Sequence, residues 1–295
     1  MTETEWLASD DPVAMLRWLQ QDPDGGGAVP GFSDRRLRLF AAACCRSESV
    51  WSRLTDDSPC GRCNECLSGA ENKCCRRINR SRRAVEVAER FADGEAEKHE
   101  LAAAYLAAES VESVLFYNDL VIRTCHNDPQ FAAEQWTRAG IAIVPSSTQA
   151  ALLREIFGNP FRPVEWKWQW FGARETLPGE KHPPSALWRP SWAAFACPWE
   201  TVVSLASRIY AERDFAALPQ LGDVLEEAGC TDEAVLRHCR GFERCWDCVE
   251  GFFSQGDPIA LQWVPCVLCD CTGWRPLRGP HVRGCWVVDM LTGKA

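Results

Sequence analysis

Apolar residues recur at the spacing of a helix along most of this chain. Between residues 33 and 46, Leu37, Phe40, Ala41 and Cys44 fall on one helical face, and Ser33 stands where an N-cap belongs. This pattern predicts a helix that buries its apolar face. It leaves three arginines on or near the solvent side: Arg35, Arg36 and Arg38.

The same period predicts helices on both sides of this segment. Asp11 followed by Pro12 marks the start of the second of two helices within residues 2–20. Ser81 is the expected N-cap of a helix that Gly94 ends. Further helices are expected over residues 48–54, 95–125, 128–140, 148–157, 200–213, 220–228, 231–239 (with Thr231 as N-cap) and 279–293.

Residues 160–198 interrupt the helical pattern with many prolines and tryptophans. In the stretch from Trp166 to Trp170, aromatic residues alternate with polar ones, which is typical of a half-buried strand. We interpret the segment as an arm that packs its tryptophans on the helical core. The alternative is an exposed aromatic surface for a partner or a carbohydrate.

Two cysteine pairs near the C-terminus have the spacing of a zinc site. Each is a Cys-x2-Cys unit, and seventeen residues separate the units. Two such knuckles joined by a hairpin supply four thiolates to one tetrahedral ion. The pattern predicts a zinc ribbon with these ligands: Cys245, Cys248, Cys266 and Cys269.

A second cysteine cluster lies earlier in the chain. Its five thiols exceed the four that one zinc ion binds, and the sequence leaves open which four would bind: Cys60, Cys63, Cys66, Cys74 and Cys75. The spacing also resembles iron–sulfur ligation, but no Cys-Pro follows, so zinc is the expected metal. The chain would then hold one or two Zn²⁺ ions.

A basic run follows this cluster directly. It could contact phosphates through five arginines: Arg76, Arg77, Arg80, Arg82 and Arg83. We favour a solvated helix start, partly neutralised by Glu86 and Glu89.

Composition and charge limit the classes of protein to which the chain can belong. The chain has 295 residues, 46% of them hydrophobic, and a net charge of −9, which argues against nonspecific nucleic-acid binding as its main role. No apolar run is long enough for a membrane span, and the acidic start Met1–Leu7 is unlike a signal peptide. We therefore expect a cytoplasmic protein whose seventeen cysteines are reduced or metal-bound.

These elements predict a mainly α protein, an irregular multi-helix bundle with two cysteine-rich zinc-binding insertions, one of them a small β zinc ribbon. The expected parts are a helical framework over residues 1–56, 81–159 and 199–240, a closing helix over 279–295, insertions at 57–80 and 241–278, and the arm at 160–198.

Several phrases together resemble a family of bacterial helical proteins that is common in planctomycetes and has no established activity. They are E-W-L-A from Glu5, L-R-L-F-A-A-A-C-C-R from Leu37, S-R-R-A-V-E-V-A-E-R-F-A-D-G from Ser81, L-L-R-E-I-F-G-N-P-F-R-P from Leu152, L-E-E-A-G-C from Leu225, H-C-R from His238 and H-V-R-G-C-W-V-V-D from His281. The resemblance implies the framework and marks both cysteine clusters and the arm as insertions. The second insertion also resembles the zinc repeats of the DnaJ chaperone family, although Cys271 stands where that motif has a glycine.

Five more residues could form a third site, either a Cys/His metal site or a Cys–His nucleophile pair: Cys44, His238, Cys239, His281 and Cys285. The alternative that we favour makes the cysteines small core residues and the histidines helix-end groups.

No phosphate-binding loop, dinucleotide motif or hydrolase motif occurs in a convincing setting, so we expect no nucleotide cofactor. The sequence favours a non-catalytic zinc-binding protein that serves as an interaction or scaffolding module for another protein. The alternatives are nucleic-acid binding through the Lys73–Arg83 run and a Cys/His metal- or thiol-dependent enzyme.

Overall fold

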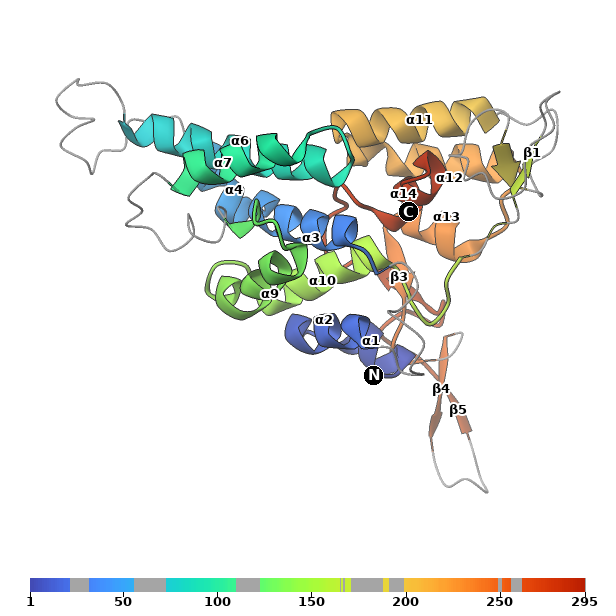
Figure 1. The fold of residues 1–295 in the computed structure, drawn as a ribbon. Coiled ribbons are helices and arrows are strands. Elements are labelled where there is room, and N and C mark those ends of the chain that lie inside the picture. Colours follow the sequence, from blue (N-terminus) through green and yellow to red (C-terminus); the bar gives the residue numbers. More distant parts are fainter. Residues whose placement is uncertain are drawn as a thin grey trace. The chain divides into compact units, whose positions relative to one another are not determined.

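The computed structural model describes residues 1–21, 32–55, 73–109, 123–164, 166, 168–170, 188–190, 199–248, 251–255 and 262–294. The chain divides into two compact units. Residues Asp10–Ile156 form what we call the N-terminal unit. Residues Met1–Ser9 together with Phe157–Ala295 form the C-terminal unit. Helices dominate both (Figure 1), which confirms the predicted mainly α fold.

The described part of the N-terminal unit is built from helices. They are α2 (Pro12–Gln20), α3 (Asp34–Arg46), α4 (Glu48–Thr55), α6 (Lys73–Ala92), α7 (Lys98–Glu109), α9 (Pro129–Ala139), the short 3-10 helix η1 (Gly140–Ala142) and α10 (Ser146–Phe157). The predicted caps are present at two starts, since Asp11 accepts from the N–H groups of Val13 and Ala14, and Ser33 accepts from that of Arg36.

Helix α3 lies at the centre of this unit, in contact with α4, α6 and α9. Its buried residues form an unbroken run from Arg36 to Cys45, so the helix is covered on all sides rather than on one face. The stretch of residues 39–45 is apolar on every side, as expected of a helical segment that is covered all round. The run of alanines lets the neighbouring helices approach closely.

The expectation that the α3 arginines remain near solvent is wrong for two of them. Arg36 is 8% exposed and Arg38 is 3% exposed. The Arg38 guanidinium donates hydrogen bonds to three backbone carbonyls that precede α9, those of Thr124 (3.2 Å), His126 (2.9 Å) and Asn127 (3.3 Å). These carbonyls replace water around the charge, which is why a buried arginine is tolerated here.

Helix α6 begins at Lys73, eight residues before the predicted N-cap Ser81. Ser81 is therefore a buried residue inside the helix and not its N-cap. The helix crosses residue 80, where the sequence pattern placed the end of the first insertion. Ion pairs join it to α3, including a two-bond contact between Arg46 and Glu89 at 3.2 and 2.8 Å.

The C-terminal unit has its own helical core. Its helices are α1 (Glu3–Ala8), α11 (Trp199–Glu212), the 3-10 helix η2 (Phe215–Ala217), α12 (Leu218–Glu227), α13 (Glu233–Cys239) and α14 (Trp286–Thr292). Helix α11 contacts α12 and α14, and α12 contacts α13. The N-cap of α13 is Asp232 rather than Thr231, and the closing helix starts at Trp286, seven residues later than predicted.

The described residues of this unit also form three short antiparallel ladders. They pair β1 (Trp168–Trp170) with β2 (Trp188–Pro190), β3 (Phe242–Arg244) with β6 (Trp274–Pro276), and β4 (Phe252–Gln255) with β5 (Gln262–Pro265). In the arm, Trp166 packs on the core edge-to-face against Trp199, with ring centroids 6.5 Å apart. Packing on the core is thus confirmed for Trp166.

Candidate metal centre

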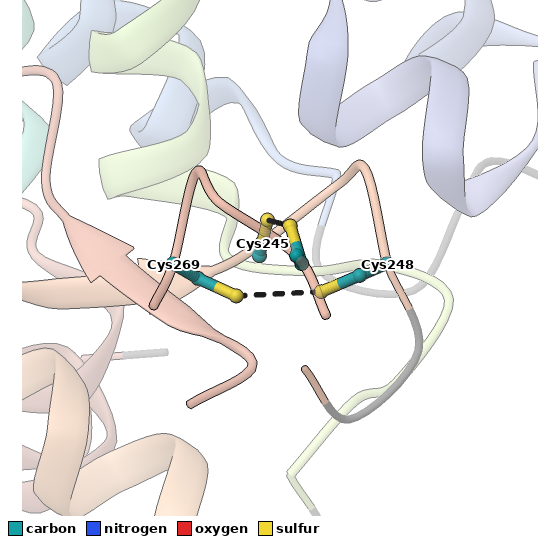
Figure 2. A group of neighbouring side chains, drawn as sticks. Cys245, Cys248 and Cys269 are labelled. Atoms are coloured by element: carbon teal, nitrogen blue, oxygen red, sulfur yellow. Dashed lines mark hydrogen bonds between the residues drawn. The ribbon is translucent and has the colours of Figure 1, made fainter. Parts of the chain in front are cut away.

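Four cysteines lie together beside the ends of the β3–β6 and β4–β5 ladders, and Figure 2 labels three of them, Cys245, Cys248 and Cys269. Cys245 directly follows β3 and Cys266 directly follows β5, and each is the first residue of its Cys-x2-Cys unit. The sulfurs of Cys245 and Cys266 lie 3.8 Å apart, and those of Cys248 and Cys269 lie 3.5 Å apart. All four sulfurs lie within 4.8 Å of one another, and none is in a disulfide.

These distances match a tetrahedral thiolate site. A zinc–sulfur bond of about 2.3 Å places the sulfurs of a regular tetrahedron about 3.8 Å apart. The two printed separations, 3.5 and 3.8 Å, lie close to that value. The predicted ligands therefore form a cluster able to hold one metal ion.

Backbone geometry shapes the cluster. The Cys245 N–H donates to the Gly273 carbonyl at 2.9 Å, and the Cys266 N–H donates to the Gly251 carbonyl at 2.8 Å. Gly251 has a φ of 91°, and a Cβ built there would lie 2.0 Å from the carbonyl oxygen of Cys271. Only glycine fits at this crossing of the two knuckles.

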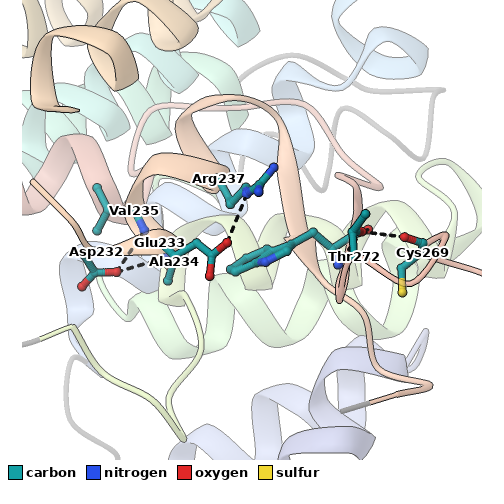
Figure 3. A network of polar contacts seen from close by, with 8 residues as sticks. Asp232, Glu233, Ala234, Val235, Arg237, Cys269 and Thr272 are labelled. Carbon is teal, nitrogen blue, oxygen red and sulfur yellow. Dashed lines mark hydrogen bonds and ion pairs between the residues drawn. The ribbon is translucent and has the colours of Figure 1, made fainter. Parts of the chain in front are cut away.

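Thr272 ties the second knuckle together. Its hydroxyl donates to the Cys269 carbonyl at 2.5 Å and accepts from the Trp274 N–H at 3.1 Å. Figure 3 shows the first of these contacts beside the start of α13, where Asp232 caps Ala234 and Val235. Side-chain bonds thus replace the hydrophobic core that so short a segment lacks.

The pKa shifts of Cys245, Cys248 and Cys269 differ in direction. Burial and hydrogen bonds to the neighbouring thiols raise the pKa of Cys248, and burial raises the pKa of Cys245. Burial also opposes ionisation of Cys269, but the Gly273 N–H, 3.3 Å from its sulfur, and the adjacent thiols lower its pKa overall. Four crowded sulfurs cannot all carry charge without a cation among them, which is the electrostatic condition of a metal site.

A charged group anchors the cluster to the rest of the C-terminal unit. The Glu243 carboxylate accepts from the guanidinium groups of Arg275 and Arg278. Arg278 also donates to the Leu7 carbonyl of the first segment. Burial lowers the pKa of Arg275 to about 10, although Glu243 acts in the opposite direction. Sequence reasoning missed this group because Glu243 lies 32 residues from Arg275 and 35 residues from Arg278.

Trp246 is half-buried, and the guanidinium groups of Arg275 and Arg278 stack on its ring. Two exposed residues were missed: Val267 and Leu268, which lie between the ligand cysteines of the second knuckle. Their exposure could have been predicted from their position within a Cys-x2-Cys knuckle, because so short a segment has too few residues to bury two apolar side chains.

Searches of family models, curated proteins and solved structures find no match to this chain. The resemblances to planctomycete helical proteins and to DnaJ zinc repeats therefore stay predictions. The candidate metal site is supported by the geometry of its four cysteines.

The first cysteine cluster lies largely outside the described residues. This holds for Cys60, Cys63 and Cys66, and for the side chains of Cys74 and Cys75, whose backbone belongs to α6. In the basic run, Arg80, Arg82 and Arg83 are exposed on α6, and Arg82 pairs with Glu86 at 3.4 Å. The side chains of Arg76 and Arg77 are outside the described part.

None of the described helices is long and apolar enough to span a membrane.

Three of the five residues predicted for a third site come together in the C-terminal unit. They are His238, His281 and Cys285, and the His238 Nε2 lies 3.3 Å from the Cys285 sulfur. Cys239 belongs to the hydrophobic core, with its Cβ against Gly222. Cys44 lies in α3 of the N-terminal unit, where burial raises its pKa well above the ordinary value.

Proposed function

We propose that the four-cysteine cluster is a zinc ribbon and that the protein is a non-catalytic module that binds another protein. The supporting observation is the closed ligand set. Four thiolates complete the tetrahedral coordination of Zn²⁺, so no position is left for water or substrate, and such an ion stabilises structure. Thiolate ligands favour zinc over magnesium or calcium, which prefer oxygen ligands.

The residues around the ion support a role in binding. Among the described residues, the large exposed hydrophobic side chains are Leu106 of α7 and four in the cysteine insertion: Phe252 (40% exposed), Trp263 (64%), Val267 (89%) and Leu268 (52%). Phe252 pairs with Pro265 and Ser254 pairs with Trp263, so both aromatic rings stand on the same face of the β4–β5 ladder. Aromatic side chains exposed together are enriched where proteins meet partners.

The metal assignment is tested by counting ions. We expect the Cys245→Ser, Cys248→Ser double variant of the full chain to bind one Zn²⁺ fewer than the unaltered chain, as measured by elemental analysis of protein purified under reducing conditions. Cys271→Ser is the matched control because Cys271 is exposed and outside the ligand set. Equal zinc content in the double variant would refute the ribbon.

The binding role is tested with surface variants. We expect a partner captured by the full chain to be lost with the Trp263→Ala, Leu268→Ser variant and retained with Leu106→Ser, which removes an exposed leucine of α7. Capture that survives the double variant would contradict binding through this surface, and zinc content checks that the ribbon is still folded.

Nucleic-acid binding is the second candidate, supported by the three exposed arginines of α6: Arg80, Arg82 and Arg83. Affinity for single- or double-stranded nucleic acid should then fall steeply with salt concentration. The absence of binding at low salt would exclude this function.

A further inference from the structure

Two imidazoles and a thiol meet inside the C-terminal unit, away from the ribbon residues in sequence. His238 lies in the last turn of α13, His281 lies in the segment between β6 and α14, and Cys285 directly precedes α14. One ligand atom from each lies within 4.8 Å of the others. His238 is 6% exposed and Cys285 is fully buried, so most of this group is shielded from water.

A turn brings His281 and Cys285 to the same place. The Cys285 N–H donates to the Val282 carbonyl at 2.9 Å, and Gly284 adopts a φ of 98°, a conformation that favours glycine. Arg283 fixes the outside of the turn, because its guanidinium lies 4.7 Å from the ring centroid of Tyr210 in α11. Cys285 is the N-cap residue of α14, yet its thiol makes no capping hydrogen bond and lies instead beside His238.

We infer that His238, His281 and Cys285 form a second metal site, of His2Cys type, for Zn²⁺ or a cation of similar ligand preference. Zinc bonds of about 2.3 Å to sulfur and about 2.0 Å to nitrogen would separate the sulfur from each nitrogen by about 3.5 Å in a tetrahedron. The observed distance between the His238 Nε2 and the Cys285 sulfur is 3.3 Å. Imidazole and thiolate are the two side-chain types that zinc binds most often.

A simple hydrogen bond between His238 and Cys285 accounts for less of the arrangement. That bond needs only two of the three groups, whereas His281 also places a ligand nitrogen within the cluster. The two imidazole rings meet at 79° with centroids 5.0 Å apart, so they are not stacked face to face. One metal ion uses all three groups at once.

This site differs from the ribbon in its chemistry. The described residues of the C-terminal unit provide three of its ligands, whereas the ribbon provides four thiolates to its ion. A zinc ion with three protein ligands accepts a fourth from water, substrate or another part of the chain. The proposed interaction role does not depend on this second site.

X-ray absorption at the zinc edge of the full, metal-loaded chain tests the inference. The ligands proposed for the two cysteine clusters are all thiolates, so the His2Cys site should add imidazole scattering to the spectrum. We expect His281→Ala to weaken the imidazole signal and to lower the zinc content by one ion per chain. The matched control is Cys239→Ala, because Cys239 is a core residue next to His238 and outside the ligand group.

The outcomes separate clearly. A spectrum of the unaltered chain with sulfur neighbours alone overturns the site, and this measurement does not depend on whether a variant folds. Imidazole scattering that persists unchanged in a folded His281→Ala variant also overturns it. If the Cys245→Ser, Cys248→Ser variant loses one ion while imidazole scattering remains, the second site stands apart from the ribbon.

Discussion

Replacement of Gly251 by alanine should disable the ribbon. The added Cβ would lie 2.0 Å from the Cys271 carbonyl oxygen, whereas ordinary contact begins at 3.4 Å, so the two backbone segments must separate by about 1.4 Å. Zinc sites tolerate errors of about 0.2 Å in their ligand distances. Because Cys271 lies two residues from Cys269, this separation should displace a ligand.

The expected loss of zinc affinity in Gly251→Ala is estimated by comparison with Gly241. That residue has a φ of 82°, and a Cβ there would meet nothing within 4 Å. Gly241→Ala therefore introduces only the strain of a left-handed backbone, about 1–2 kcal/mol. Gly251→Ala introduces the same strain and the clash, so we expect zinc affinity at least about 10-fold weaker, which corresponds to about 1.4 kcal/mol or more.

Competition with a chromophoric chelator under reducing conditions measures this difference. The Gly241→Ala variant should bind zinc with an affinity close to that of the unaltered chain while unfolding at lower denaturant concentration. Equal zinc affinity in the two glycine variants would refute the argument that the knuckles must touch at Gly251.

Three further results are expected. Glu243→Gln should lower the free energy of unfolding by about 2 kcal/mol in a denaturant titration, because Arg275 and Arg278 would face each other without a carboxylate, and an unchanged midpoint would contradict this role. Zinc chelation should leave most of the helical circular dichroism, since the core packed between α6 and α7 contains none of the proposed ligands and the C-terminal core consists mainly of apolar side chains, and complete loss would disprove that independence. Burial raises the pKa of Cys125 to about 12, so at pH 8 about one thiol in ten thousand is ionised; iodoacetamide should modify exposed Cys271 far faster in peptide mass spectrometry, and the reverse order would contradict burial of Cys125.

The helical framework could be predicted from the sequence because its signals are local. Apolar spacing and caps such as Asp11 and Ser33 depend only on neighbouring residues, and the structure confirms them. Arg38 could not be placed, because its burial depends on carbonyls that lie 86 to 89 residues away. The start of α6 could not be predicted either. Ser81 is a favourable N-cap residue, but α6 begins at Lys73, so Ser81 lies inside the helix.

The candidate metal sites also contain some residues that the sequence could identify and others that it could not. The spacing of the Cys-x2-Cys pairs identified all four clustered cysteines, because a knuckle is a local structure. The convergence of His238 with Cys285 depends on packing across 47 residues, so sequence could only offer it as one option among five residues. The exposure of Val267 and Leu268 required knowledge of which side of the knuckle faces the protein.

The four cysteines lie outside the β4–β5 hairpin, so the strands of the hairpin are not needed as metal ligands. All ligands lie at its base, with Cys248 before β4 and Cys266 after β5, and β4 and β5 pair with each other. An ion bound by these four thiolates would therefore close a loop whose described strands, β4 and β5, supply no ligand. Because the entropic cost of loop closure rises only slowly with length, the chain between these strands can lengthen, shorten or change sequence while the base stays intact. Such a hairpin can acquire a new specificity without a new fold.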